Sequence, residues 1–284
     1  MAIPTETRPE DLAARVAELH WYHTLELAPG VRTPGYFDTR PTVGKLPLPA
    51  SLAGKRCLDV GTWDGFWAFE MERRGAASVT AIDIEDARRW DWPPRMLLPG
   101  TDDSDRKLIE AFKSGGASFE LAREALGSAV DRIDVSVYDL DPGEQGRFDF
   151  VFLGSLLLHL RDPVLALARV RAACAPGGEA VIADTVDAIP SWLRPRTPSA
   201  RLEGVGRPWW WIPNVAGLQR MVESAGFELL ERTGVYFLPT GAAHPPTPLR
   251  ALARFPFSAA GREQLINRWR GIPHAAVRAR PLGG

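Results

Sequence analysis

The chain has 284 residues, of which 45% are apolar and 24% charged, a composition that supports a sizeable buried core and excludes a disordered chain. Its formal net charge of −1 excludes the strongly basic balance of many nucleic-acid-binding proteins. That average hides a split, because the 13 arginines and 5 acids from Arg194 onward give this part +8 and leave the first 193 residues at −9.

No part of the sequence predicts a membrane or secreted protein. Mean hydropathy is −0.14, and no run approaches the roughly 18 apolar residues of a membrane span. The N-terminus lacks a basic segment followed by an apolar one, so we expect a cytoplasmic protein. Cys57 and Cys174 border apolar runs and are expected to be buried, reduced thiols.

Residues 1–50 are expected to form an N-terminal helix and a wrapping loop. The sequence at 7–10 has the pattern of a capping box with proline near the first helical position, which predicts a helix to about His20. The tract that follows, up to Pro49, is rich in glycine and proline and shows neither helix nor strand periodicity. We therefore expect it to wrap over the rest of the chain.

Residues 51–284 are predicted to form one α/β domain with insertions at about 190–213 and 237–271. Strands alternate with helices, which predicts a doubly wound, mainly parallel sheet. The last strand is expected to return antiparallel beside the sixth. The expected strands are 55–60, 78–84, 133–138, 148–153, 179–184, 229–236 and 274–280, and the expected helices are 66–74, 118–126, 163–173, 215–225 and 262–270.

The loop after the first strand carries the most informative chemistry. A dinucleotide fingerprint that starts at Gly61 would need glycines at positions 63 and 66, which hold Trp63 and Phe66, and no P-loop lysine follows. The loop instead has two glycines and an acid at each end, Asp59 and Asp64. This pattern suits a ligand with cationic groups and no phosphates, as S-adenosylmethionine is.

Two further acids follow later strands of the predicted sheet. Asp83 ends the second strand, 24 residues after Asp59, where a carboxylate can bind both hydroxyls of a ribose. Asp139 follows the third strand, within reach of an adenine amino group. Each acid alone also suits a solvated loop residue or a helix cap, but three acids at successive strand ends favour a nucleoside site.

Several segments carry a resemblance to a known family. LDVGTWDGFWAFE at 58–70 and AIDI at 81–84 resemble the nucleotide loop and second strand of class I S-adenosylmethionine-dependent methyltransferases. The segments WYHTLEL at 21–27, TPGYFD at 33–38 and GSLLLHLRDP at 154–163 resemble the family related to the tRNA wobble-hydroxyuridine methyltransferases. The similarity covers about residues 19–240.

The resemblance implies a Rossmann-like, seven-stranded methyltransferase fold and a donor site. In the wobble-uridine enzymes the loop has no tryptophan at the position of Trp63, and an upstream lysine helps to select a carboxylated donor. Lys45 lies upstream here without the surrounding family pattern, so we expect S-adenosylmethionine as a plain methyl donor. The donor residues implied are Asp59, Gly61, Thr62, Trp63, Asp64, Asp83, Ile84, Asp139, Leu140, Gly154 and Ser155.

Two histidines are candidates for the base that deprotonates the acceptor. His159 follows the fourth strand beside the expected acceptor pocket, although it also suits a packing or helix-capping role. His23 lies in the N-terminal wrap, and its alternative role is a structural hydrogen bond. No spacing of histidines or carboxylates predicts a metal site.

Ten tryptophans, several of them in predicted loops, suit stacking on a flat or sugar acceptor. They equally suit coverage of the sheet or a contact within a homo-oligomer. Tyr22, Trp211 and Asn214 are the candidate acceptor residues.

The sequence thus favours an enzyme that methylates a hydroxyl of a small molecule or glycan. The alternative is a tRNA wobble-uridine methyltransferase, for which the basic C-terminal part would contact phosphates. A non-catalytic S-adenosylmethionine-binding protein is a second alternative, since a fold does not by itself establish chemistry.

Overall fold

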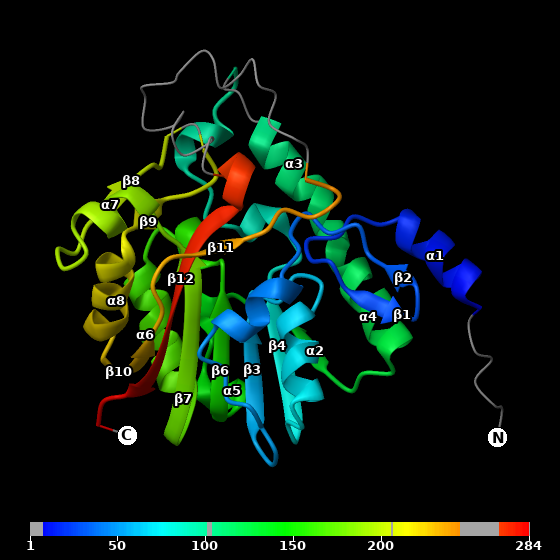
Figure 1. Cartoon of the computed structure of the whole chain (residues 1–284), viewed down its shortest axis with the longest axis horizontal. Helices are drawn as coiled ribbons and strands as arrows, with labels where there is room; N and C mark the ends of the chain where they lie inside the picture. Colours follow the sequence, from blue (N-terminus) through cyan, green and yellow to red (C-terminus); the bar gives the residue numbers. More distant parts are fainter. Residues whose placement is uncertain (1–7, 101–103, 206, 245–266, 284) are drawn as a thin grey trace.

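The computed structural model describes residues 8–100, 104–205, 207–244 and 267–283, in which a central sheet is flanked by helices (Figure 1). The strand order is β10-β12-β7-β6-β3-β4-β5, with β11 paired to β12. Strands β7, β6, β3, β4 and β5 pair in parallel, whereas β12 runs antiparallel to its neighbours. This confirms the doubly wound α/β fold. The main sheet has eight described strands, because the predicted strand 229–236 is divided into β10 and β11.

The main-sheet strands are β3 (Arg56–Val60), β4 (Ser78–Asp83), β5 (Asp131–Asp134), β6 (Phe148–Gly154), β7 (Cys174–Thr185), β10 (Phe227–Arg232), β11 (Tyr236–Leu238) and β12 (Ile272–Pro281). Two hairpins add β1 (Glu26–Ala28), β2 (Val31–Arg32), β8 (Ala200–Leu202) and β9 (Trp211–Pro213). The α-helices are α1 (Pro9–Ala17), α2 (Phe66–Arg73), α3 (Ser104–Lys113), α4 (Ala117–Leu126), α5 (Pro142–Gln145), α6 (Pro163–Ala173), α7 (Ala188–Leu193) and α8 (Val215–Ser224). Short 3-10 helices are η1 (Arg40–Lys45), η2 (Ala87–Arg89), η3 (Pro94–Leu97), η4 (Ser114–Gly116), η5 (Val137–Asp139) and η6 (Leu157–His159).

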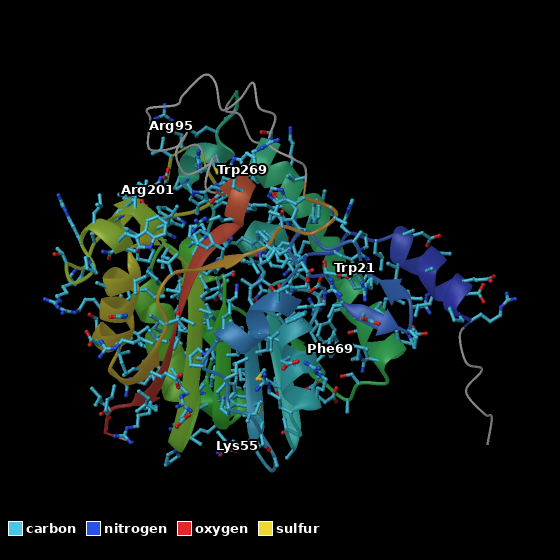
Figure 2. The ribbon with its side chains drawn as sticks, in the orientation of Figure 1. Trp21, Lys55, Phe69, Arg95, Arg201 and Trp269 are labelled. Atoms are coloured by element: carbon cyan, nitrogen blue, oxygen red, sulfur yellow. The ribbon has the colours of Figure 1, made fainter. Side chains whose placement is uncertain are left out.

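The two faces of the sheet bury two separate apolar cores. Successive strand side chains point to opposite faces, so Val151 and Leu153 of β6 pack with α6 and α8, while Phe150 and Phe152 pack with α2 and α4. Helix α1 and the N-terminal wrap join the second core. Trp21, beside α1 and the β1–β2 hairpin (Figure 2), is fully buried and donates its indole N–H to the Val16 carbonyl at 2.9 Å.

Strand β3 lies between β4 and β6, so the order of the parallel strands reverses on either side of it. In open α/β sheets a ligand binds outside the carboxyl ends of the strands at such a reversal. The loops after β3, β4 and β6 therefore meet at one edge of the sheet, and α3 lies above that edge (Figure 1).

Besides the divided strand 229–236, three sequence predictions differ from the structure. The predicted strand 133–138 is wrong in its bounds, because β5 ends at Asp134 and the chain turns into η5, where Ser136 Oγ accepts from the Tyr138 N–H at 3.2 Å. The tract to Pro49, expected without regular structure, contains the β1–β2 hairpin and η1. The predicted first helix ends at Ala17, three residues before His20.

The structure also bears on the predicted last helix, the two cysteines and membrane-spanning helices. Of the predicted helix 262–270, residues 267–270 are helical, and 262–266 lie outside the described part. Both cysteines are buried and free, as expected. None of the helices in the described part of the chain has the length and apolarity needed to cross a bilayer.

Gly65 permits the tight passage from the β3 loop into α2, and this generates a prediction about stability. Its φ is +92°, and a Cβ there would meet the rings of Phe69 at 2.4 Å and Phe119 at 2.9 Å. We expect Gly65→Ala to lower the free energy of unfolding by about 2–4 kcal/mol, because backbone strain and overpacking add.

Gly30 supplies the matched control, since its φ is +80° and a Cβ added there would have nothing within 4 Å. Gly30→Ala should cost about 1 kcal/mol from strain alone. Urea unfolding of both variants measures the difference, and equal losses would show that the ring contacts do not matter.

Candidate functional site

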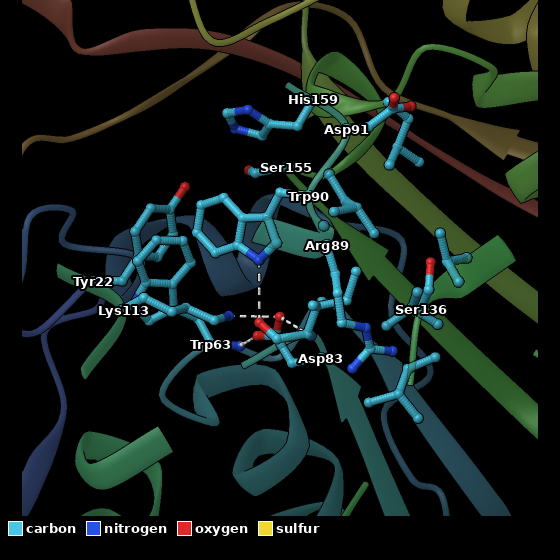
Figure 3. Close-up of a pocket in the computed structure, with 18 of the residues that line it drawn as sticks. Tyr22, Trp63, Asp83, Arg89, Trp90, Asp91, Lys113, Ser136, Ser155 and His159 are labelled. Atoms are coloured by element: carbon cyan, nitrogen blue, oxygen red, sulfur yellow. Dashed lines mark hydrogen bonds and ion pairs between the residues drawn. The ribbon is translucent and has the colours of Figure 1, made fainter. Parts of the chain in front are cut away.

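A cavity opens at the carboxyl edge of β3, β4 and β6 (Figure 3). Ten residues named from the sequence line it: Tyr22, His23, Asp59, Gly61, Trp63, Asp83, Ile84, Gly154, Ser155 and His159.

The floor of the cavity is the loop between β3 and α2. The N–H groups of Gly61 and Thr62 donate to the Ile82 carbonyl at 2.8 and 3.1 Å, which fixes the loop on the end of β4. Gly61 has a φ of +77°. At the base of the loop, Asp59 is buried, and its Oδ2 has no hydrogen-bond partner among the described residues.

Burial raises the pKa of Asp59 to about 7, and the nearby Thr62 and His23 partly oppose that rise. A buried carboxylate oxygen without a donor is costly unless a ligand supplies one. Asp59 therefore provides a place for a cationic group inside the cavity.

Asp83, at the end of β4, is bound from three sides (Figure 3). Its Oδ2 accepts from the backbone N–H of Trp63 at 2.6 Å, and its Oδ1 accepts from the backbone N–H of Ile84 at 2.7 Å. The Lys113 ammonium lies 2.5 Å from the same Oδ1. The acid expected at the ribose is thus in place, accompanied by a lysine that the sequence did not point to.

Aromatic rings form one wall of the cavity. Trp63 stacks on Tyr22 with ring centroids 4.7 Å apart, and Trp90 lies 6.0 Å from Trp63. The Lys113 Nζ lies 4.6 Å from the Trp63 ring centroid and 5.4 Å from that of Trp90. The buried indole N–H of Trp63 has no partner among the described residues.

Asp64, predicted from the sequence as a donor-binding residue, instead binds the N-terminal wrap. It is fully buried, and its carboxylate accepts from the N–H groups of Tyr22 and His23 at 2.8 Å each and from His23 Nδ1 at 2.5 Å. These bonds hold the N-terminal wrap over the β3 loop. Because both oxygens are used within the protein, Asp64 does not line the cavity.

At the far end of the cavity, Ser136 and Val137 stand where the third acid was expected. Strand β5 ends at Asp134, so Asp139 lies exposed beyond the lining and Leu140 is buried in the core. The structure therefore does not bring Asp139 or Leu140 to the cavity.

His159 lines the cavity and has a fixed tautomer. A carbonyl only accepts, so His159 donates its Nδ1–H to the Pro208 carbonyl at 2.8 Å and keeps a lone pair on Nε2. Burial lowers its pKa, and the bond to Pro208 opposes that fall. The ring is thus neutral near pH 7 and able to accept a proton.

A second buried histidine, His274 at the start of β12, lies behind the cavity wall. Its Nδ1 donates to the Ile272 carbonyl at 3.0 Å, and its Nε2 therefore accepts from Ser155 Oγ, also at 3.0 Å. Burial lowers the pKa of His274 to about 4, so the ring stays neutral. Ser155 has a φ of +52°, a conformation this contact helps to hold.

Three other predicted residues lie outside the lining. Thr62 is buried in the loop. Asn214 caps α8 by accepting from the Gly217 N–H at 2.8 Å, and its amide donates to the Thr197 carbonyl at 2.9 Å. The Trp211 indole donates to the Arg161 carbonyl at 3.0 Å. Asn214 and Trp211 thus hold the chain beside the mouth rather than line it.

The lining also contains residues that the sequence did not assign to the site, including Trp67, Arg89, Asp91, Ile109, Lys113, Ser136 and Tyr138. Trp90 and Trp92 were noted only as loop tryptophans. Lys113 belongs to α3, a helix for which the sequence pattern gave no prediction. Nowhere in the described part of the chain do three or more His, Cys, Asp or Glu side chains gather as a metal site.

Comparison with known proteins identifies relatives. A family model described as a methyltransferase domain matches residues 39–232. The tRNA U34 carboxymethyltransferase of Alcanivorax borkumensis is 29% identical over 184 residues, which are 64% of this chain and 47% of that protein. The protein of the same name from Ectopseudomonas mendocina is 31% identical over 180 residues, 62% of this chain and 46% of its own.

The chain therefore spans about half the length of the curated relatives it matches. Among solved structures, the N-terminal domain of EvdMO1 with SAH bound has a TM-score of 0.53 and 16% identity, and the match covers 99% of this chain and 100% of that one. At this identity the likeness concerns the fold alone.

The orphaned oxygen of Asp59 generates a prediction about cation binding. We expect Asp59→Asn to weaken S-adenosylmethionine binding at pH 8 at least about tenfold, because an ionised carboxylate binds a cationic donor far better than an amide does. In the wild type, affinity should fall as pH drops through about 7, where the raised pKa of Asp59 protonates it.

Titration calorimetry from pH 6 to 8 measures both effects. In Asp59→Asn, the change of donor affinity with pH that comes from Asp59 should disappear. Any change that comes from Asp184, whose pKa burial also raises to about 7, should remain. Asp139→Asn is the matched control and should bind as the wild type. A large loss in Asp139→Asn would restore that residue to the site.

Proposed function

The chain belongs to the methyltransferase domain family, and we propose that it is a class I enzyme with S-adenosylmethionine as methyl donor and the wobble uridine of a tRNA as acceptor. The residues present fit the donor. Asp59 offers an unpartnered buried oxygen to a cation, and Asp83 lies at the end of the next strand for a ribose.

The names of the relatives support this acceptor. The matched proteins from two organisms are both tRNA U34 carboxymethyltransferases, and they share 29–31% identity with about two thirds of this chain. About half of each relative lies outside the match, so the likeness concerns the methyltransferase part of those proteins.

The observation that carries the proposal is a rim of arginines and indoles at the mouth of the cavity. The Arg161 guanidinium lies 5.7 Å from the Trp210 ring centroid, and the Arg207 guanidinium lies 5.5 Å from that of Trp209. Pro208, between them, lines the cavity. Arginines beside aromatic faces bind phosphates and unstacked bases, which is how single-stranded RNA is recognised.

A cavity with an aromatic wall also suits an acceptor base turned out of its stack. Enzymes that modify a base extrude it into a pocket and hold it by stacking and hydrogen bonds. Tyr22 and Trp90 offer aromatic faces along the wall, and the Trp63 indole offers an N–H without a partner among the described residues. A uracil ring has the shape and the acceptors for such a wall.

A hydroxyl of a small molecule or glycan is the second candidate acceptor. The net charge of −1 favours it, because a chain without excess positive charge gains little from a polyanion. The same aromatic wall would stack on a sugar or a small ring.

When bound, S-adenosylmethionine supplies a methyl group activated by its sulfonium sulfur. The protein then needs to orient the acceptor and remove its proton. We propose that His159 Nε2 accepts the proton that the acceptor group loses. Its lone pair is available because the Nδ1–H of the same ring donates to the Pro208 carbonyl. His23 is bound to Asp64 through Nδ1 and holds the wrap, which leaves it as the second candidate base.

Binding to unmodified bulk tRNA tests the acceptor. We expect the affinity to fall steeply between 50 and 200 mM salt, because phosphate contacts release counterions. Arg161→Gln, at a side chain 68% exposed, should weaken tRNA binding. It should also reduce the slope of log affinity against log salt by about 1, the share of one phosphate contact. Arg8→Gln, at the exposed residue that precedes α1, is the control. Salt-independent binding, or methyl incorporation into small hydroxyl compounds only, would favour the second candidate.

Turnover with the acceptor so identified tests His159. We expect His159→Ala to lower kcat about 10²–10⁴-fold while the donor affinity stays within twofold. Wild-type turnover should fall only as pH drops below the usual imidazole value, since burial lowers the pKa of His159. His20→Ala is the control, because His20 is exposed and outside the lining. If His159→Ala and His23→Ala both keep near wild-type kcat, neither histidine is the base.

A further inference from the structure

Lys113 is a buried ammonium inside the cavity that the proposed methyl transfer does not use. It ends α3, and its side chain is only 4% exposed. Its Nζ lies 2.5 Å from Asp83 Oδ1 and faces the rings of Trp63 and Trp90 (Figure 3). Burying a charge is costly unless it is paired, so this position requires all of these partners.

The bonds that Asp83 already makes within the protein explain why the lysine matters. A carboxylate has about four lone-pair sites. Three are taken, by the N–H groups of Trp63 and Ile84 and by the Lys113 ammonium. One site is left for a ligand, whereas a ribose presents two neighbouring hydroxyls. Asp83 alone therefore cannot accept from both.

We propose that Lys113 and Asp83 together form the ribose site of the donor, the carboxylate accepting from one hydroxyl and the ammonium donating to the oxygen of the other. An ammonium has three N–H donors, and one is used on Asp83. A hydroxyl both donates and accepts, so the pair matches a ribose diol. The proposal rests on the donor site of this methyltransferase and not on the identity of the acceptor.

Lys113 is held in place rather than free to leave. Desolvation lowers the pKa of Lys113, and the ion pair with Asp83, at 2.5 Å, opposes that fall. Its two indole neighbours attract a cation through their faces. Moving the side chain out of the cavity would leave Asp83 with one fewer donor in a buried place, which favours a ligand that binds beside Lys113.

Calorimetry with S-adenosylhomocysteine and its 2′-deoxy and 3′-deoxy ribose analogues tests this directly. The sulfur of this ligand is neutral, so a long-range effect of Lys113 on a sulfonium does not enter. In the wild type, loss of either hydroxyl should weaken binding about tenfold or more, as expected for hydrogen bonds to charged groups.

Lys113→Met should weaken S-adenosylhomocysteine about tenfold or more. It should also bind one of the two deoxy analogues as well as the parent ligand, because the partner of that hydroxyl is gone. Lys113→Gln, which keeps a donor, should recover part of the affinity. Lys107→Met, at an exposed lysine of the same helix, is the matched control and should bind as the wild type.

Three results would overturn the proposal. Tighter binding by Lys113→Met would show that the ammonium competes with the ligand, and unchanged affinity would show that it serves the fold alone. If Lys113→Met does not fold, the wild type decides: a deoxy analogue that binds as well as the parent would show that only one hydroxyl has a partner. None of these readouts depends on the acceptor, so a failure of the tRNA proposal leaves them interpretable.

Discussion

The site depends on one buried carboxylate. Asp64 is fully buried and accepts from two backbone N–H groups and one imidazole nitrogen of the segment at 22–23. A buried carboxylate is tolerable only when its oxygens are occupied, and here the occupants come from a segment about forty residues earlier in the chain. The N-terminal wrap is thereby fixed over the β3 loop, and Tyr22 and His23 become walls of the cavity.

The aromatic wall follows from that attachment. Trp63 and Ser155 are the two non-glycine residues with positive φ in the described chain, and both line the cavity. Such a conformation costs of order 1–3 kcal/mol and persists only where surrounding contacts determine it. Trp63 is held by its N–H bond to Asp83 and by stacking on Tyr22, and Ser155 by His274. Strain of this kind concentrates at binding sites.

The sequence predicted the parts of the fold that local physics determines. Strands β3, β4 and β6 are apolar runs that end at loops with acids or glycine, so their positions were confirmed. Strand β5 is short and half exposed, and its sequence DRID has no clear strand pattern. The strand was therefore predicted too far along the chain, and the adenine contact was expected at Asp139. The cavity there is lined by Ser136 and Val137 instead.

Residues brought in by tertiary contacts could not be predicted in the same way. Lys113 lies at the end of a polar helix, and only the placement of α3 above the sheet edge carries it to Asp83. His274 was assigned to a strand correctly, yet its contact with Ser155 spans 119 residues. For Asp64, the loop pattern predicted a donor-binding acid. Its carboxylate instead binds the N-terminal wrap through Tyr22 and His23, a contact that the sequence pattern does not show.

The charge split in the sequence also changes meaning in the structure. Many arginines after Arg194 bind carboxylates: Arg278 contacts Glu179 and Glu231, Arg280 contacts Glu228, and Arg201 contacts Asp187 and Glu203. Ion pairs of this kind join β12 to β7 and β10. Those with Glu179 and Asp187 offset part of the +8, which already counts the other three acids. At the rim, a polyanionic acceptor would meet Arg207 over an indole and Arg161, which lies over another indole while paired with Asp91 at 3.2 Å. Because that rim is small, recognition of an RNA here must rely on what enters the cavity more than on how many phosphates are bound.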